Sequence, residues 1–519
     1  FQIGFNYNSL AKIYQQKGDR EKALFCLNKA FDIAKKNNSN ISLAYKNFGE
    51  FYLESEEFDK ALDFYLKAIK LEEEQRSVNI LEDYYEKTGE IYEKTCKIQE
   101  AYTYYLKSID IIEHKRQYMK VEEFKRDFMK DKIEVYEKVI DLLIKMGRPE
   151  EAFNYNEKAR SRAFLDILAN QKIDISHGVK PELAGKEERL KTRIQYLSSE
   201  IREKNTSAKE KELKKLKSDY EEVMEEIKLE SPEYTSLISV NPLSLKQIRE
   251  SLDNDTVIAE YFLGDKRGYV WIVGKDIFKT FVIEHKREEI EAIVKSLRET
   301  MCDHMTSEKL SSDKWKDLSK NLYNILFKDI DKYTKDKRLV IAPHRILHYL
   351  PFQVLMDEHG TMVIEKYEIT YLPSASVLKY CRDKNSMKKD KLLAFELGNL
   401  KLEGFSPLPG TEREVKNLSP FFSEKEIYKG KDMRAELLYK KGGDFDVLHV
   451  ATHGVLDPGS PLFSSLIFSD RQLPVYEIFN LNLKAYLVTL SACRTGLGEE
   501  SSGDELVGLT RAFIYAGTP

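Results

Sequence analysis

Cysteine is scarce and scattered in this sequence. The 519 residues contain five cysteines, and none of them forms a CxxC pair. A disulfide framework and a zinc ribbon both need clustered cysteines, so the sequence excludes them. Separated thiols are typical of a reducing compartment, and we expect a cytoplasmic protein. The cysteines are Cys26, Cys96, Cys302, Cys381 and Cys493.

Long hydrophobic runs and an excess of one charge are also missing. No apolar run approaches the roughly 18 residues that a transmembrane helix needs, and no signal peptide follows Phe1. The formal net charge is −4, from 83 basic and 87 acidic residues. We therefore predict neither a membrane nor a direct nucleic-acid partner. The length favours roughly two to four globular domains.

What the sequence does contain, in its N-terminal third, is an internal repeat. In three copies an aromatic residue is followed by a small residue, then a tyrosine, then an alanine, at constant spacing. These positions are Tyr7, Ala11, Tyr14 and Ala23 in the first copy, Tyr45, Gly49, Tyr52 and Ala61 in the second, and Tyr85, Gly89, Tyr92 and Ala101 in the third. A looser fourth copy has its turn at Gly147. Small residues at such spacing mark the close crossing of two antiparallel helices, with large side chains beside them.

This pattern resembles the tetratricopeptide repeat, a helix–turn–helix unit of about 34 residues. Stacked units form a solenoid whose concave face commonly binds a peptide or a helix. We expect residues 1–170 to form such a docking solenoid, with a passive spacer as the alternative. The repeated tyrosines should lie in its core, and Cys26 and Cys96 should be buried as small hydrophobic residues.

A charged connector follows at residues 171–232. Lys and Glu dominate its residues 183–229, while apolar residues recur every three or four positions. That period predicts a helical hairpin or short coiled coil, with a turn near "NTSAK". We interpret the charges as solvated faces of a rigid arm that carries no chemistry.

The remaining residues, 233–519, alternate between strand and helix patterns. Runs such as "TVIAEYFLG", "GYVWIVG", "FDVLHVATHG" and "KAYLVTLSAC" read as strands. Strands that alternate with helices favour a mostly parallel sheet. The nearly continuous apolar character of 446–451 and 485–490 predicts strands buried on both faces.

Two of these strands stop at a reactive residue. One ends in His453-Gly454, the other in Cys493. Ligands of open α/β sheets bind beyond the carboxyl ends of the strands. If the two strands are neighbours, imidazole and thiol come together, and the imidazole can generate the nucleophilic thiolate. The backbone amides of Gly454 and Cys493 could then donate to an oxyanion.

The motifs "LHVATHG", "LVTLSACRTG" and "GDELVGLTRAFIYAGTP" resemble the CHAT family, caspase-like domains found with tetratricopeptide repeats in bacteria. "RLVIAPHRILHYLPFQVL", "YEITYLPSASVL", "LPGTEREV" and "EKARSRAFLDIL" support the resemblance. It implies a multidomain chain, in which an all-α solenoid precedes an α/β caspase-like domain with a mostly parallel sheet flanked by helices. Residues 233–385 would be a degenerate caspase-like part and 386–519 the active part, continuing beyond Pro519.

The resemblance also implies an activity and its partners. Cys493 would be the nucleophile and His453 the general acid and base of a cysteine endopeptidase that acts on a protein substrate. No cofactor and no metal are implied. The repeat domain would recruit the substrate or an activator, which can be a protein or a ribonucleoprotein, as in bacterial or CRISPR-associated antiviral defence. A catalytically inert protein-binding scaffold is the alternative.

Other polar residues leave alternatives open. His449 shares a strand face with His453, and a metal pair with Cys493 is conceivable, although the spacing fits no common zinc pattern. His344 and His348 are interpreted as structural. Ser502 and Glu505 fit a helix capping box. Alternatively, Asp504 and Glu505 line a pocket for a basic P1 side chain.

Overall fold

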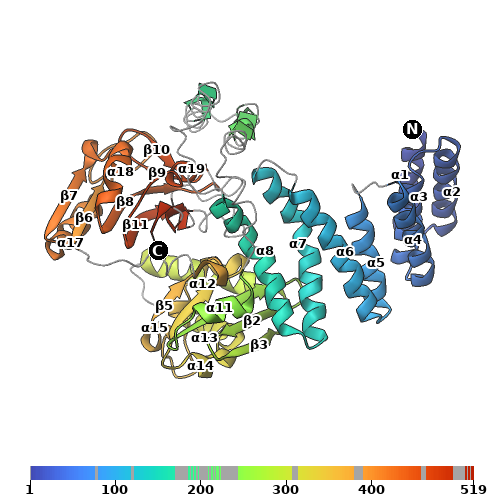
Figure 1. Ribbon diagram of the computed structural model, residues 1–519, viewed down its shortest axis with the longest axis horizontal. Helices are drawn as coiled ribbons and strands as arrows, with labels where there is room; N and C mark the ends of the chain where they lie inside the picture. Colours follow the sequence, from blue (N-terminus) through green and yellow to red (C-terminus); the bar gives the residue numbers. More distant parts are fainter. Residues whose placement is uncertain are drawn as a thin grey trace. The chain divides into compact units, whose positions relative to one another are not determined.

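The computed structural model describes residues 2–75, 80–117, 122–169, 243–306, 314–378, 390–457 and 463–494, with short stretches between 185 and 223 and between 509 and 518. The chain divides into two compact units, Phe1–Tyr155 and Asn156–Pro519 (Figure 1). Within the described part, no helix is both long and apolar enough to cross a membrane.

The first unit is built from helix pairs. Consecutive helices pack together through short turns, as expected for the repeat. The helices are α1 (Gln2–Gln16), α2 (Arg20–Lys36), α3 (Ile41–Glu54), α4 (Phe58–Glu74), α5 (Leu81–Lys94), α6 (Ile98–Gln117), α7 (Glu122–Lys145) and α8 (Pro149–Ala169), whose C-terminal part belongs to the second unit.

The turn inside each helix pair contains one residue in the left-handed region. These residues are Gly18 (φ 76°), Glu56 (φ 58°), Cys96 (φ 59°) and Gly147 (φ 72°). The expectation that Cys96 is buried is therefore wrong: it occupies the turn, outside the helical core pattern, and is exposed. Cys26 lies inside α2 and is buried, as predicted.

The small residues of the repeat are explained by the side chains opposite them. A Cβ added to Gly49 would meet the Tyr65 ring at 2.7 Å, and one added to Gly89 would meet the Tyr105 ring at 2.6 Å. The first repeat has Ala11 at this position, and the smaller Leu27 shares its core cluster. The prediction that small residues mark the helix crossings is confirmed.

Gly89→Ala should therefore loosen the third helix pair. Its Cβ would overlap the fully buried Tyr105 ring, and overpacking of this kind costs about 1–3 kcal/mol. Hydrogen–deuterium exchange should become faster in α5 and α6. Gly4→Ala in α1 is the matched control, because its new Cβ would lie 3.5 Å from Ile33 in ordinary contact. Unchanged exchange in α5 and α6 would contradict the packing argument.

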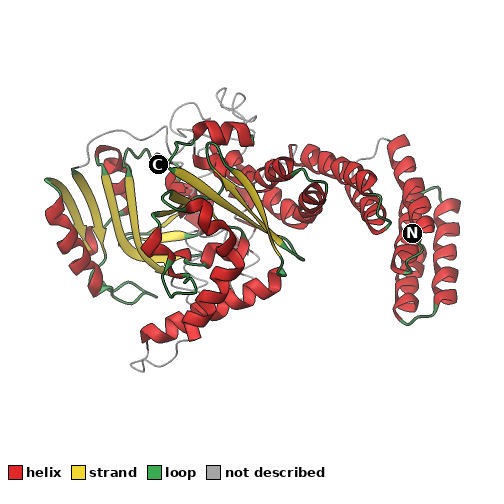
Figure 2. Ribbon diagram, turned by 90° about the horizontal axis from the view of Figure 1, so that it is seen from below, coloured by secondary structure: helices red, strands yellow, loops and turns green. Residues whose placement is uncertain are grey.

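The second unit contains two mixed sheets, each with helices beside it (Figure 2). The first sheet has the order β3-β2-β1-β4-β5. Strands β1, β4 and β5 are parallel, whereas β1, β2 and β3 form an antiparallel meander, because no helix separates them in sequence. The strands are β1 (Thr256–Leu263), β2 (Gly268–Val273), β3 (Phe278–Ile283), β4 (Arg338–Ala342) and β5 (Ile369–Tyr371).

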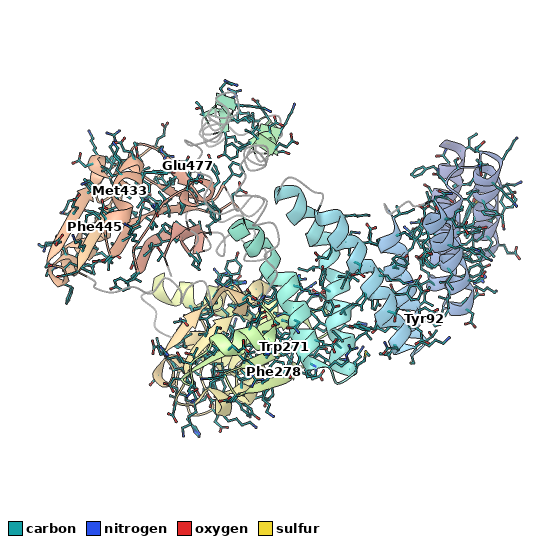
Figure 3. All side chains as sticks on the ribbon, viewed as in Figure 1. Tyr92, Trp271, Phe278, Met433, Phe445 and Glu477 are labelled. Carbon is teal, nitrogen blue, oxygen red and sulfur yellow. The ribbon has the colours of Figure 1, made fainter. Side chains whose placement is uncertain are left out.

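Helices of the same region complete the core of the first sheet. Side chains from α12, α13 and α14 share one apolar cluster with alternate residues of β1, β2 and β4. On β2, Trp271 is fully buried (Figure 3). The helices are α11 (Leu245–Ser251), α12 (Arg287–Thr306), α13 (Lys314–Leu326), α14 (Lys328–Thr334) and α15 (Val363–Lys366). Ser244 and Gln247 form a capping box that begins α11.

In the second sheet, β7, β6, β8 and β11 are parallel neighbours, and β9 and β10 are antiparallel. One face packs against α17 and the opposite face against α18. The strands are β6 (Lys391–Glu396), β7 (Glu424–Lys429), β8 (Val447–Val455), β9 (Ser465–Ile467), β10 (Gln472–Pro474) and β11 (Leu487–Arg494). The helices are α17 (Pro409–Leu418), α18 (Ala435–Lys441) and α19 (Val475–Ile478). The predicted fold class is confirmed.

The prediction of two fully buried strands is right for β8 and wrong for β11. All residues of β8 except Val455 are buried. In β11, Leu487 is 45% exposed and the residues from Val488 to Ala492 are half-buried. Among the described residues, β11 pairs with β8 alone, which accounts for its greater exposure there.

Candidate active site

Strands β8 and β11 are neighbours, and their register pairs the two reactive residues. Eight consecutive positions are matched, from Leu487 opposite Val447 to Arg494 opposite Gly454. Within this ladder Cys493 is the partner of His453. Adjacent strands lie about 4.8 Å apart, and paired positions of parallel strands share a sheet face. The backbone alone therefore brings the two positions together at the carboxyl edge.

The sequence had suggested that the strand ends at His453-Gly454, but the strand extends beyond this pair. Strand β8 continues through Gly454 to Val455, because these two residues pair with Leu466 and Ser465 of β9. Gly454 thus lies within the sheet, between β9 and β11. That the backbone amides of Gly454 and Cys493 donate hydrogen bonds to an oxyanion remains a prediction.

The imidazole of His453 is held by the loop that joins β6 to α17. Its Nε2 lies 2.7 Å from the carbonyl oxygen of Ser406. The Phe405 ring packs on it, with 5.1 Å between ring centroids. The imidazole is buried, and its Nδ1 has no hydrogen-bond partner among the described residues. A carbonyl can only accept, so Nε2 donates to it, and in the neutral form of the ring Nδ1 is the acceptor nitrogen.

Sequence reasoning missed both contacts of this imidazole. Ser406 acts through its backbone carbonyl, which leaves no mark in the residue type. Phe405 stands in "LEGFSP", three residues before the first residue of the motif "LPGTEREV". A bulky residue in an otherwise turn-like segment was the signal that could have drawn attention to this loop.

Below the His453–Cys493 pair, a second polar group lies on the same face. The Glu414 carboxylate accepts a hydrogen bond from Ser491 Oγ at 3.0 Å. Its other oxygen is 3.2 Å from His449 Nε2, a close approach without hydrogen-bond geometry. Burial lowers the pKa of His449, and the Glu414 charge partly opposes this. His449 shares the face of His453, as the alternation of a strand requires.

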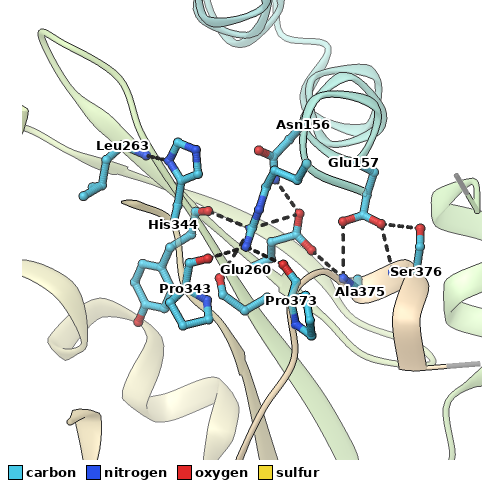
Figure 4. A network of polar contacts seen from close by, with 12 residues as sticks. Asn156, Glu157, Glu260, Leu263, Pro343, His344, Pro373, Ala375 and Ser376 are labelled. Carbon is cyan, nitrogen blue, oxygen red and sulfur yellow. Dashed lines mark hydrogen bonds and ion pairs between the residues drawn. The ribbon is translucent and has the colours of Figure 1, made fainter. Parts of the chain in front are cut away.

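The carboxyl edge of the first sheet is filled by a buried polar network (Figure 4). Arg160 of α8 donates to the carbonyl oxygens of Tyr261 at 3.0 Å and Pro373 at 2.9 Å, and also to those of Ala342 and Pro343. Glu157, one turn earlier, accepts from the backbone amides of Ala375 at 3.2 Å and Ser376 at 2.8 Å. These contacts give "EKARSRAFLDIL" a structural role.

Two titratable groups of this network have displaced pKa values. Burial, and then the neighbouring Glu157 carboxylate, raise the pKa of Glu260 well above its usual range, while Arg160 partly opposes them. Burial, and then the charge of Arg160, hold the pKa of His344 well below its usual range. His344 Nδ1 accepts the Leu263 amide at 2.9 Å, so the structural interpretation of this histidine agrees with its contacts.

Some predicted residues cannot be placed. Asp504, Glu505 and Ser502 lie outside the described residues, and of Cys493 only the backbone is described. Among the described residues, no group of three or more His, Cys, Asp or Glu could hold a metal ion.

The chain thus consists of helical repeats followed by an α/β region, in which a histidine and a cysteine occupy matched positions of neighbouring strands. Comparison with known families agrees with it. Residues 316–519 match the CHAT domain, and residues 3–74 match a tetratricopeptide repeat. The chain therefore carries an N-terminal tetratricopeptide-repeat region and a C-terminal CHAT domain. No curated protein matches the sequence.

Solved structures are similar at low sequence identity. BtubC (BKLC) from P. vanneervenii is 14% identical with a TM-score of 0.26, over 46% of this chain and 84% of that chain. Two structures of the Saccharomyces cerevisiae separase–securin complex are 10% and 12% identical, with TM-scores of 0.33 and 0.34. They are matched over 99% and 100% of this chain, which spans 49% and 45% of theirs.

Proposed function

We propose that the chain is a caspase-like cysteine endopeptidase with Cys493 as nucleophile and His453 as general acid and base. The observation that carries the proposal is the register of β8 and β11, which pairs these two positions within a CHAT domain. Nδ1 of His453 has no hydrogen-bond partner among the described residues, which supports the proposal because a base needs an available acceptor.

The reaction follows from these groups. Nδ1 of His453 takes the thiol proton, and the thiolate sulfur attacks the peptide carbonyl carbon to form a tetrahedral oxyanion. The imidazolium returns the proton to the departing amine as the C–N bond breaks. Water, deprotonated by the same imidazole, then hydrolyses the thioester and regenerates the thiol. The Ser406 carbonyl holds the Nε2 proton throughout and orients the ring.

Mapping of new peptide ends tests the proposal. Purified protein is added to a lysate of the source cells, and the N-termini created by wild type are compared with those created by Cys493→Ala. We expect a defined set of ends that the variant does not produce. A covalent peptidyl electrophile should label Cys493 in wild type and label it much less in His453→Ala. Identical ends in both lysates, together with unchanged labelling, would refute the proposal.

Phe405→Ala should lower kcat while leaving KM nearly unchanged. Without the ring packed on it, the imidazole can turn away from the Ser406 carbonyl. A misplacement of about 1 Å can cost on the order of 100-fold in rate, and we expect about 10- to 100-fold here. Phe421→Ala is the matched control, because that side chain is 81% exposed. The kcat values are measured by steady-state kinetics on a peptide that contains a mapped cleavage site. Equal kcat values for both variants would contradict the role of Phe405.

The preference at P1 stays a prediction. If Asp504 and Glu505 line the P1 pocket, Asp504→Ala should reduce cleavage after Arg or Lys far more than cleavage elsewhere. A peptide library with varied P1 residue measures this. An unchanged preference would leave the capping-box interpretation of Ser502 and Glu505.

For the repeat region, we propose that it recruits the substrate or an activating protein or ribonucleoprotein, in a defence pathway of a bacterium. The tetratricopeptide-repeat match supports protein binding. The alternative is an inert scaffold, in which the repeats bind a protein and the CHAT domain has no activity. His453-dependent labelling of Cys493 would exclude the scaffold.

A further inference from the structure

The contacts of Glu414 point to a role beyond its own helix. Its two carboxylate oxygens face two different strands, Ser491 of β11 and His449 of β8. Ser491 stands two residues before Cys493, and His449 stands four residues before His453. Alternation along a strand assigns all four positions to one sheet face. The carboxylate therefore contacts both strands that carry the proposed catalytic pair, with a hydrogen bond to β11 and a close approach to β8, directly below that pair.

The order of the three groups excludes a second catalytic centre. In a Ser–His–acid triad the imidazole lies between hydroxyl and carboxylate. Here the carboxylate lies in the middle, and the hydroxyl of Ser491 donates to it at 3.0 Å. The three groups therefore do not form a Ser–His–acid relay, and their contacts lie between the two strands.

The helix that carries Glu414 is itself fixed to the sheet. Thr411, one turn earlier, accepts the Gly398 amide at 3.0 Å and donates to the Leu408 carbonyl at 2.8 Å. Val415, the next residue after Glu414, is fully buried against the sheet. The motif "LPGTEREV" thus supplies a rigid helix, and Glu414 extends from it to β8 and β11.

Strand β11 carries the proposed nucleophile, so its placement sets the geometry of the pair. Its side chains from Val488 to Ala492 are half-buried, and among the described residues its backbone pairs with β8 alone. A shift near Ser491 would be passed to Cys493 two residues later.

We propose that Glu414 is a positioning residue that fixes Cys493 opposite His453 by joining β11 to β8 through Ser491 and His449. This inference rests on the proposed function, because it assigns the positioned residue as the nucleophile. Glu414 acts on the thiol only through Ser491 and β11.

Steady-state kinetics on the full chain test this. Ser491→Ala and Glu414→Ala should lower kcat about 10- to 100-fold with KM within about threefold of wild type, the scale of a small misplacement. Glu414→Gln keeps an oxygen that accepts the Ser491 hydrogen bond and should retain most of the activity. Glu412→Gln, an exposed position of the same helix, is the matched control. Thermal unfolding of each variant identifies any that fail to fold. If Glu414→Ala does not fold, the kcat values of Ser491→Ala and Glu414→Gln decide whether Glu414 has the positioning role.

A second measurement separates this inference from the proposed function. The alkylation rate of Cys493 by iodoacetamide, followed by mass spectrometry of its peptide, should change in Ser491→Ala and Glu414→Ala and stay the same in Glu414→Gln. If Cys493→Ala is inactive while Ser491→Ala and Glu414→Ala keep wild-type kcat, the positioning role is overturned and the endopeptidase stands. If Cys493→Ala is as active as wild type, the endopeptidase fails, and the alkylation rates alone decide the positioning role. An equal loss in Glu414→Gln would overturn the hydrogen bond as its basis.

Discussion

Cys493→Ala is expected to reduce peptide hydrolysis below detection, and His453→Ala to lower kcat by about 10²- to 10⁴-fold. Alanine at 493 removes the attacking sulfur altogether. Alanine at 453 leaves the sulfur but removes the acceptor Nδ1, which has no other partner among the described residues. Rates are measured on a peptide containing a mapped cleavage site. His359→Ala, at a side chain that is 80% exposed, should match wild type.

The pH dependence distinguishes loss of the base from general damage. In His453→Ala the attacking thiolate must form by simple ionisation, and an ordinary thiol has a pKa of about 8.5. The residual kcat/KM should then rise about tenfold per pH unit until the pH passes that value. A residual rate that does not change with pH would contradict the role of His453 as base, and full activity of Cys493→Ala would contradict the nucleophile.

Arg160→Ala is expected to destabilise the second unit by about 3–5 kcal/mol, the cost of leaving buried partners of a charge unpaired. The Arg160 side chain is 6% exposed and lies 3.6 Å from the buried Glu260 carboxylate. Its guanidinium also accounts for hydrogen bonds to four backbone carbonyls, including those of Tyr261 and Pro373. Lysine offers a single point charge without the planar fork, so Arg160→Lys should fall between alanine and wild type.

Urea unfolding followed by tryptophan fluorescence measures this effect selectively. Both tryptophans of the chain, Trp271 and Trp315, lie in the second unit. Arg148→Ala is the control: Arg148 lies in the turn directly before α8, and its side chain is 35% exposed and pairs with Glu151, which limits the expected loss to about 1 kcal/mol or less. Equal unfolding midpoints for Arg160→Ala and Arg148→Ala would contradict the bridging role of Arg160.

Sequence patterns predicted the parts of this molecule that repeat or alternate. The small residues at Gly49 and Gly89 had to face bulky neighbours, because helices cross closely only where one side lacks a side chain. The strand containing His453 was predictable from its apolar run. Cys96 was misjudged, because a helical pattern does not show where the chain turns.

Contacts between distant segments were not predictable. The approach of Ser406 to His453 depends on the path of a loop and involves a backbone atom. The extension of β8 to Val455 depends on the β9–β10 hairpin, which pairs from another part of the chain. The link from Glu414 to Ser491 spans 77 residues in sequence. Only the placement of α17 over the sheet brings these two side chains together.

The pairing of Gly49 with Tyr65 and of Gly89 with Tyr105 also sets which pieces of the solenoid are interchangeable. A chimera that exchanges whole helix pairs keeps each small residue with its own large neighbour. A chimera that replaces α2 by α4 would press a tyrosine against the side chain of Ala11, and the reverse exchange would leave a void beside Gly49. The unit of recombination in this region is therefore the helix pair and not the single helix.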